Sequence, residues 1–357
     1  MKSFIIDRYL VREAAAASVA VLAVLFSVLA ANQLIRYLVD VADGKLDGGA
    51  IAVLMGFQTL RYLGVVVPAA LFLGAVLTLG RLYRDNEMSV LAACGVGPGR
   101  ITRGLLILGV PAALLVAWLS LWVAPWATHA ADRYAAEAAR AAEVEGIQAG
   151  RFVGGAGGAM YAGTADADGR MRHVFVRIRD GASETIIHAD RGDQRVEGSN
   201  GDRYLILEKG VRYDGSPDKP AWRVTRFERH GILLEEPRAV RVRRGRDGQP
   251  SRDLLRSNQI ADKAELHWRL AMPAMALVLL VVAVPLAKVN PREGRFGALL
   301  MGVLIYLFYF QLVTAGRDWL EQGLVPAALG LWWLHILLFA AAWLWMWWRF
   351  GMGVRKA

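Results

Sequence analysis

Six long runs without a charged residue stand out from the mixed polar and apolar pattern of this 357-residue chain. Each is close to the roughly 20 residues that an α-helix needs to cross a bilayer. With His335 counted as neutral, the runs cover residues 14–35, 62–80, 104–128, 270–287, 296–316 and 322–348. The pattern predicts six membrane-spanning helices in two groups of three. The first run is longer than the roughly 7 to 15 residues of a secretory signal core, so we expect a retained helix.

The segment between the two groups has a different pattern. Residues 127–146 are rich in Ala, Glu and Arg, which favours a helix that continues from the third span. In MRHVFVRIR, residues 171–179, Val174, Val176 and Ile178 fall on one face of a predicted strand. Similar runs, separated by turn signals, are AMYAGTA at 159–165, RYLILEKG at 203–210 and AWRVTRFERHGILLE at 221–235. This spacing predicts an all-β sandwich or a barrel-like domain.

The chain thus divides into three spans in residues 1–128, a β domain with its linkers in 129–263, and three spans in 264–357. It is 55% hydrophobic with a net charge of +10. Lys and Arg gather in the short loops on one side, which include both termini and the loop 81–103. Because these residues prefer cytosolic loops, we expect the termini in the cytosol and the β domain on the far side. This explains the positive charge without nucleic-acid binding.

Motifs for catalysis and cofactors are absent from the sequence. The six histidines are scattered, with no HExxH and no CxxC to indicate a metal site. There is no GxxxxGK[ST] phosphate loop, so the chain cannot hydrolyse ATP alone. The single Cys94 excludes an intramolecular disulfide. We therefore expect a membrane protein that is not an enzyme and needs no cofactor or metal.

A short half-polar helix, about residues 85–95, is predicted between the second and third spans. Asp85 or Asn86 can cap its start, Glu87 lies in its first turn, where the helix dipole favours an anion, and Gly95 ends it. Apolar residues recur at helical spacing on one side, at Met88, Leu91 and Ala92. Such a helix is suited to dock in a groove of another protein. It also fits a capped connector that lies on lipid headgroups.

Three arginines lie toward the outer side of the predicted spans. Arg61 falls in the outer half of the second span, and a cation there should face protein or a polar cavity. Arg36 and Arg317 stand at the outer ends of the first and fifth spans. Three cations at one level suit the phosphates of an anionic lipid headgroup. The alternative is that each reaches bulk lipid phosphates by snorkelling.

Two further patterns fit structural roles. Glu265 and Arg269 are spaced i and i+4, so they can pair on one helix face. The sixth span contains WWLHILLFAAAWLWMWW, whose tryptophans fit a lipid-facing anchor belt at the membrane interface.

Several motifs resemble those of the lipopolysaccharide export permeases of Gram-negative bacteria, the LptF and LptG type. They are RYLVRE at 8–13, LGRLYRDNEMSVLAACGVG at 79–97, AELHWRLAMPA at 264–274 and VPLAKVNPREGR at 284–295. They match the LptF branch better, chiefly through VNPREGR. The order of three spans, β domain and three spans agrees with the family over the whole chain.

The resemblance implies the non-catalytic permease half of an ABC-type exporter in the bacterial inner membrane. It implies a paralogous permease as partner and two copies of a cytosolic ATPase beneath the pair. The helix near Glu87 would be the coupling helix in the ATPase groove, with Glu87 as its acidic residue. The β domain would be a periplasmic jelly roll that passes lipopolysaccharide to single-span and periplasmic bridge proteins.

An apolar strand face would shelter acyl chains on that route. Val174, Val176 and Ile178 are candidates, because each methylene exposed to water costs about 0.8 kcal/mol. The same residues can instead fill the core of a sandwich. A different class of function, a membrane-anchored periplasmic scaffold or sensor with no transport role, also fits the layout and would need no ATPase.

Overall fold

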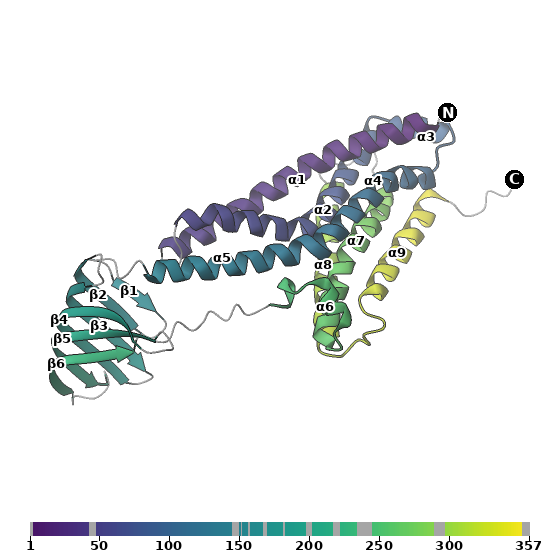
Figure 1. Cartoon of the computed structure of the whole chain (residues 1–357). Coiled ribbons are helices and arrows are strands. Elements are labelled where there is room, and N and C mark those ends of the chain that lie inside the picture. Colours follow the sequence, from purple (N-terminus) through teal and green to yellow (C-terminus); the bar gives the residue numbers. More distant parts are fainter. Residues whose placement is uncertain are drawn as a thin grey trace. The chain divides into compact units, whose positions relative to one another are not determined.

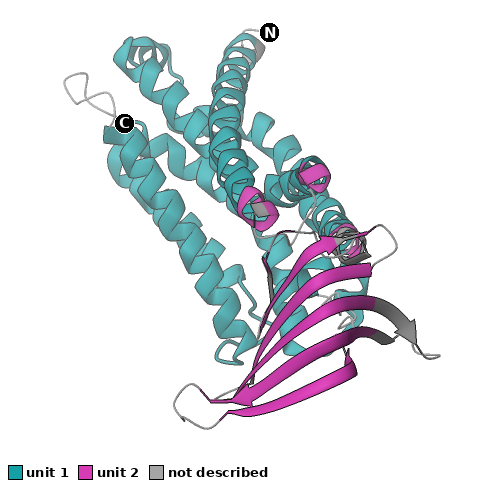
Figure 2. Cartoon of the chain, turned by 90° about the vertical axis from the view of Figure 1, so that its left-hand side faces the viewer, with its two compact units in different colours: residues 1–36, 52–132, 244–357 teal, residues 37–51, 133–243 magenta. Residues whose placement is uncertain are grey.

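The computed structural model describes residues 3–42, 48–144, 150, 152–155, 158–166, 170–180, 183–197, 202–216, 222–233, 245–288 and 297–351. The chain divides into two compact units, which Figure 2 shows in different colours. The helical unit combines residues 1–36, 52–132 and 244–357, and the unit with the β-sheet combines residues 37–51 and 133–243. As the sequence pattern predicts, the sheet is inserted between two helical parts of the chain.

The described helices follow the predicted spans (Figure 1). They are α1 (Ser3–Ala42), α2 (Ile51–Arg84), α3 (Glu87–Ala93), α4 (Pro98–Trp118), α5 (Ala124–Val144), α6 (Ser251–Arg256), α7 (Ile260–Leu286), α8 (Gly297–Glu321) and α9 (Trp332–Phe350). A π-helical turn, Leu119–Val123, joins α4 to α5, and short 3₁₀ turns occupy Gly48–Ala50 and Arg246–Gly248.

Within the described ranges, five helical segments are long and apolar enough to cross a membrane. They contain the first five predicted spans: α1, α2, α4 with α5, α7 and α8. The sixth predicted run, 322–348, is helical only from Trp332 onward, in α9. Before it the chain turns, with positive φ at Gly323 and Gly330 that glycine adopts freely. α9 (Trp332–Phe350) is not among these five segments.

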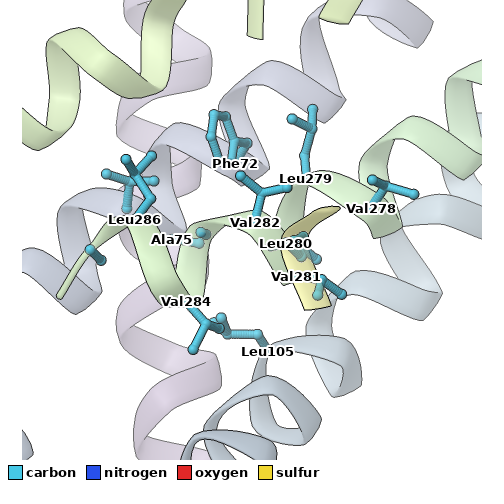
Figure 3. Packing of buried hydrophobic residues seen from close by; sticks show 14 of the residues in the cluster. Phe72, Ala75, Leu105, Val278, Leu279, Leu280, Val281, Val282, Val284 and Leu286 are labelled. Carbon is cyan, nitrogen blue, oxygen red and sulfur yellow. The ribbon is translucent and has the colours of Figure 1, made fainter. Parts of the chain in front are cut away.

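The core of the helical unit is built around α7. Its residues 278–284 form one buried cluster with Phe72 and Ala75 of α2 and Leu105 of α4 (Figure 3). In the apolar 18-residue stretch of α7, 78% is buried, as expected for a helix that is apolar on all sides. In the apolar 18-residue stretches of α1 and α8, only 11% and 17% are buried. These two helices therefore leave apolar faces for lipid or another protein to cover.

A close crossing joins α1 to α2. A Cβ added to Gly74 would lie 2.6 Å from the backbone nitrogen of Ser18, too close for any other residue without a shift of the helices. Near it, the Thr78 hydroxyl donates to the carbonyl oxygen of Glu13 at 3.3 Å. Glycine at this position lets the two backbones approach each other, as small residues do between membrane helices.

The second unit contains a six-stranded antiparallel sheet in the order β1 to β6. Its strands are β1 (Phe152–Gly155), β2 (Gly158–Ala165), β3 (Arg170–Asp180), β4 (Ser183–Glu197), β5 (Asp202–Gly215) and β6 (Arg223–Leu233). The predicted β domain is confirmed, but the described strands form a single meander and not the two layers of a sandwich or a jelly-roll-like fold. Short connections between successive strands favour hairpins between neighbours, which produces this order.

Candidate functional site

The short helix α3 lies between α2 and α4, where the sequence predicts it. Asn86 occupies its N-cap with φ 60° and makes no side-chain cap hydrogen bond, so the expected side-chain cap is absent. Asn tolerates this left-handed conformation better than most residues. After Cys94, Gly95 takes φ 83° and Val96 N–H donates to the Leu91 oxygen at 2.9 Å, which ends the helix as predicted.

The carboxylate of Glu87 is anchored to α1. The Tyr9 hydroxyl donates to Glu87 Oε2 at 2.9 Å. One turn further along α1, Glu13 pairs with Arg81 at the end of α2, at 2.8 Å. Tyr9 and Glu13 both belong to the RYLVRE motif. This motif therefore fixes the start of α3, a role that sequence reasoning did not assign to it.

The apolar side of α3 faces its own bundle. Met88 is only 3% exposed and belongs to the main buried cluster, against which Leu91 packs half-buried. Ala92 and Val90 are exposed. The apolar spacing that indicated a docking face therefore attaches the helix to the bundle at Met88 and Leu91. The surface available to another protein includes Ala92 and adds Val90, which the pattern did not single out.

Among the residues that the structure describes, two of the three outer arginines have carboxylate partners. Arg61 pairs with Asp247, in the 3₁₀ turn before α6, at 2.8 Å, and both side chains are partly exposed. Arg317 lies 3.0 Å from Glu265 and 3.2 Å from Glu321. Arg36 is exposed on α1. Arg61 and Arg317 thus form ion pairs with different carboxylates. Neither the prediction of a shared headgroup site nor the alternative of snorkelling to bulk lipid anticipates these pairs.

A buried polar network lies at the start of α7. Glu265 and Arg269 pair at 2.8 Å with side chains 4% and 3% exposed, which confirms the predicted i, i+4 pair. Arg269 also donates to four oxygens of the segment that enters α6: the carbonyls of Arg246, Asp247 and Gln249, and the hydroxyl of Ser251, at 2.8 to 3.0 Å. Ser251 in turn donates to the Leu121 oxygen in the π-helical turn at 2.6 Å. The network ties the segment leaving the β domain to the bundle.

An apolar pocket lies between α1 and α2. Its lining includes Phe26, Leu29, Gln33, Met55, Tyr62 and Val66. Gln33 is only 8% exposed, and within the described structure its amide nitrogen has no hydrogen-bond partner. Because buried polar groups are normally paired, this donor is suited to an acceptor on a bound molecule. Sequence reasoning missed the pocket, since a lone Gln in an apolar run carries no motif.

The predicted acyl-chain residues of β3 have different surroundings. Val174 and Val176 lie in the buried cluster on one face of the sheet. Ile178 is 36% exposed and outside that cluster, because its neighbours in register are Gly158 and Thr185, which offer little apolar cover. The simple alternation also breaks at His173, whose φ is 54°. Of the three residues predicted to line an acyl-chain groove, Val174 and Val176 are therefore buried and Ile178 is partly exposed.

A polar cluster borders this strand region on β4 to β6. Arg212 donates to both oxygens of Asp214 at 2.9 Å, Thr185 donates to Asp214 at 2.8 Å, and Arg212 lies 3.3 Å from His230 Nε2. Burial tends to raise the pKa of Asp214, but the hydrogen bonds from Thr185 and Arg212 outweigh it and lower the pKa. Burial and the Arg212 charge lower the pKa of His230.

Comparison with known proteins identifies the family. The model for "Lipopolysaccharide export system permease LptF/LptG" matches residues 8–349, which include both helical parts and the sheet. The lipopolysaccharide export system permease protein LptF of Escherichia coli K12 is 27% identical over 342 residues, 95% of this chain and 93% of that protein. The protein of the same name from Shigella flexneri gives the same values. The chain therefore belongs to the LptF/LptG family of lipopolysaccharide export system permeases.

Proposed function

We propose that this lipopolysaccharide export permease works as one half of an ABC-type exporter in the inner membrane. It extracts lipopolysaccharide from the membrane and passes it to a periplasmic bridge for delivery to the outer membrane. Both termini and α3 lie in the cytosol, and the insert of residues 129–263 lies in the periplasm, an orientation supported by the distribution of Lys and Arg. The observation that carries the proposal is α3, a short helix fixed to its bundle with an acidic start and an accessible outer side.

A cytosolic ATPase dimer is the proposed partner at α3. Tyr9 and Met88 hold the helix, so a push from a bound ATPase would reach α1 and the bundle core. Glu87 would meet a basic group of the ATPase, and Ala92 with Val90 would fill its groove, while Met88 and Leu91 support the helix from behind.

A paralogous permease is the proposed partner in the membrane. The large exposed apolar faces of α1 and α8 support it, because membrane helices that face only lipid leave no enclosed cavity for a substrate. Among the described strands, β1 and β6 lie at the edges of the sheet, which supports contact with the β domains of the single-span and periplasmic bridge proteins by strand addition.

The lipid would be held between these surfaces. The pocket between α1 and α2 would receive part of an acyl chain. An ester or amide oxygen of the lipid would then accept a hydrogen bond from the unpaired side-chain amide of Gln33. Arg36 and Arg61 lie near Gln33 and Tyr62 in the sequence, and with Arg317 they would bind headgroup phosphates. In the periplasm, Val174 and Val176 would shelter acyl chains, with Ile178 at the rim of the groove.

Purification of the full chain with its cellular partners tests this function. We expect a paralogous permease, an ATPase and bound lipopolysaccharide to elute together, and we expect ATP to release the lipid in proteoliposomes. A chain that binds neither ATPase nor lipopolysaccharide would contradict the proposal and leave a scaffold or sensor role.

A further inference from the structure

Two cations meet where α7 and α9 end. Lys288 follows the C-cap of α7, and Arg349 lies in the last turn of α9. The Lys288 ammonium donates to the carbonyl oxygen of Arg349 at 2.7 Å, and the Arg349 guanidinium donates to the carbonyl oxygen of Lys288. These reciprocal bonds hold two positive charges together from positions 61 residues apart.

The pair lacks a negative partner in the described structure. Arg61, Arg81 and Arg317 each have a carboxylate within 4 Å, whereas none of the described carboxylates lies that close to Lys288 or Arg349. Carbonyl oxygens at a helix end favour a cation, but they do not neutralise it. Burial and the Arg349 charge both lower the pKa of Lys288, so the ammonium is less stable here than in water.

Aromatic side chains surround the two cations. The Lys288 nitrogen lies 4.5 Å from the ring centre of Phe350, and the Arg349 Cζ lies 5.8 Å from that of Trp345. Trp347 and Trp348 are large exposed residues at the same end of α9. Trp is enriched at the membrane–water boundary, where lipid phosphates lie. We therefore expect the cations to lie at the level of the lipid phosphates, which are the most abundant anions at that boundary.

We infer that Lys288 and Arg349 form a binding site for the phosphate of an anionic phospholipid, separate from the transported lipid. One phosphodiester can accept hydrogen bonds from both side chains and offset their mutual repulsion. Basic pockets between membrane helices on the cytoplasmic side bind such headgroups. Because α9 packs against α7, the lipid would also hold the end of the core helix against its neighbour.

Native mass spectrometry of the full chain tests the site with cardiolipin, phosphatidylglycerol and zwitterionic phosphatidylethanolamine as probes. The double variant Lys288→Gln/Arg349→Gln removes both cations. The control Arg8→Gln/Arg103→Gln removes two exposed cations from the same predicted side of the membrane. We expect at least tenfold weaker binding of the two anionic lipids by the double variant, no change in the control, and weak binding of phosphatidylethanolamine throughout.

Several results would overturn the inference. One is equal binding by the double variant and the wild type, and another is an equal loss in the control. Displacement of cardiolipin by millimolar inorganic phosphate would assign the site to a free anion, and displacement by lipopolysaccharide would assign it to the transport route. Loss of the ATPase with lipid retained would make the pair a protein interface. If the double variant does not fold, the two single Gln variants provide the same comparison.

Discussion

Replacing Arg269 with Met should strongly destabilise the helical unit. The change removes one partner of an ion pair whose side chains are 4% and 3% exposed, and it leaves four oxygens without their donor. Breaking a buried ion pair costs about 3–5 kcal/mol, and a lost bond from a charged donor about 1.5–3 kcal/mol. These costs do not add within one network, and Arg317 still pairs with Glu265 at 3.0 Å. We therefore expect a loss of about 3–5 kcal/mol.

Equilibrium unfolding in mixed SDS and maltoside micelles measures this free energy. The matched control is Arg133→Met, because Arg133 and Glu137 have the same i, i+4 spacing on α5 but lie 3.9 Å apart with side chains 66% and 65% exposed. That change should cost less than about 0.5 kcal/mol. A double-mutant cycle with Glu265→Gln isolates the pair, and its coupling should exceed about 1 kcal/mol. Equal small losses at Arg269 and Arg133 would refute the argument.

Three other expectations follow from the geometry. Glu87→Lys should abolish co-elution with the ATPase, since like charges at an interface cost several kcal/mol, and normal assembly of this variant would remove the docking role. Gly74→Leu should cost at least about 1–3 kcal/mol by overpacking against Ser18, whereas Gly80→Ala, with open space around it, should be near neutral in the same unfolding assay. The β-sheet should lose stability as the pH falls below about 6.5, because the lowered pKa of His230 means that the unfolded chain binds the proton first. Hydrogen exchange of β5 and β6 should show this loss, and His230→Asn should remove it.

Much of the fold can be predicted from the local periodicity of the sequence, and the elements that this pattern missed were missed for a physical reason. The uncharged runs and the strands β2, β3, β5 and β6 appear directly in the sequence. β1 and β4 were missed. β1 reads FVGG, a short run with two glycines, and β4 carries charged residues through SETIIHADRGDQRVE, so neither shows a regular apolar alternation. β4 is a strand because it pairs with β3 and β5 along its length, so tertiary pairing overrides propensity there.

The contacts of the candidate sites also fall into two groups: some follow from spacing along one helix, and others form only when distant segments meet in the folded chain. The Glu265–Arg269 pair follows from spacing along one helix and was predictable. The carbonyls that Arg269 holds come from a segment that returns to α7 only in the folded chain. The orientation of Met88 was equally hidden, since an apolar stripe indicates burial but does not say whether the cover is the same chain or a partner.

The ion pairs also distinguish the arginines that would meet a lipid phosphate. Glu265 is buried and pairs with both Arg269 and Arg317, so moving Arg317 to a phosphate would withdraw one of the two cations that stabilise a buried carboxylate. The pair of Arg61 with Asp247 is partly exposed, and such pairs contribute only about 0–1 kcal/mol. A phosphate can replace Asp247 at little cost, and the freed carboxylate can return to water. Arg61 is therefore better suited than Arg317 to bind a headgroup, and the 3₁₀ turn that carries Asp247 would stay in place, because Arg269 holds the carbonyl oxygens of Arg246 and Asp247.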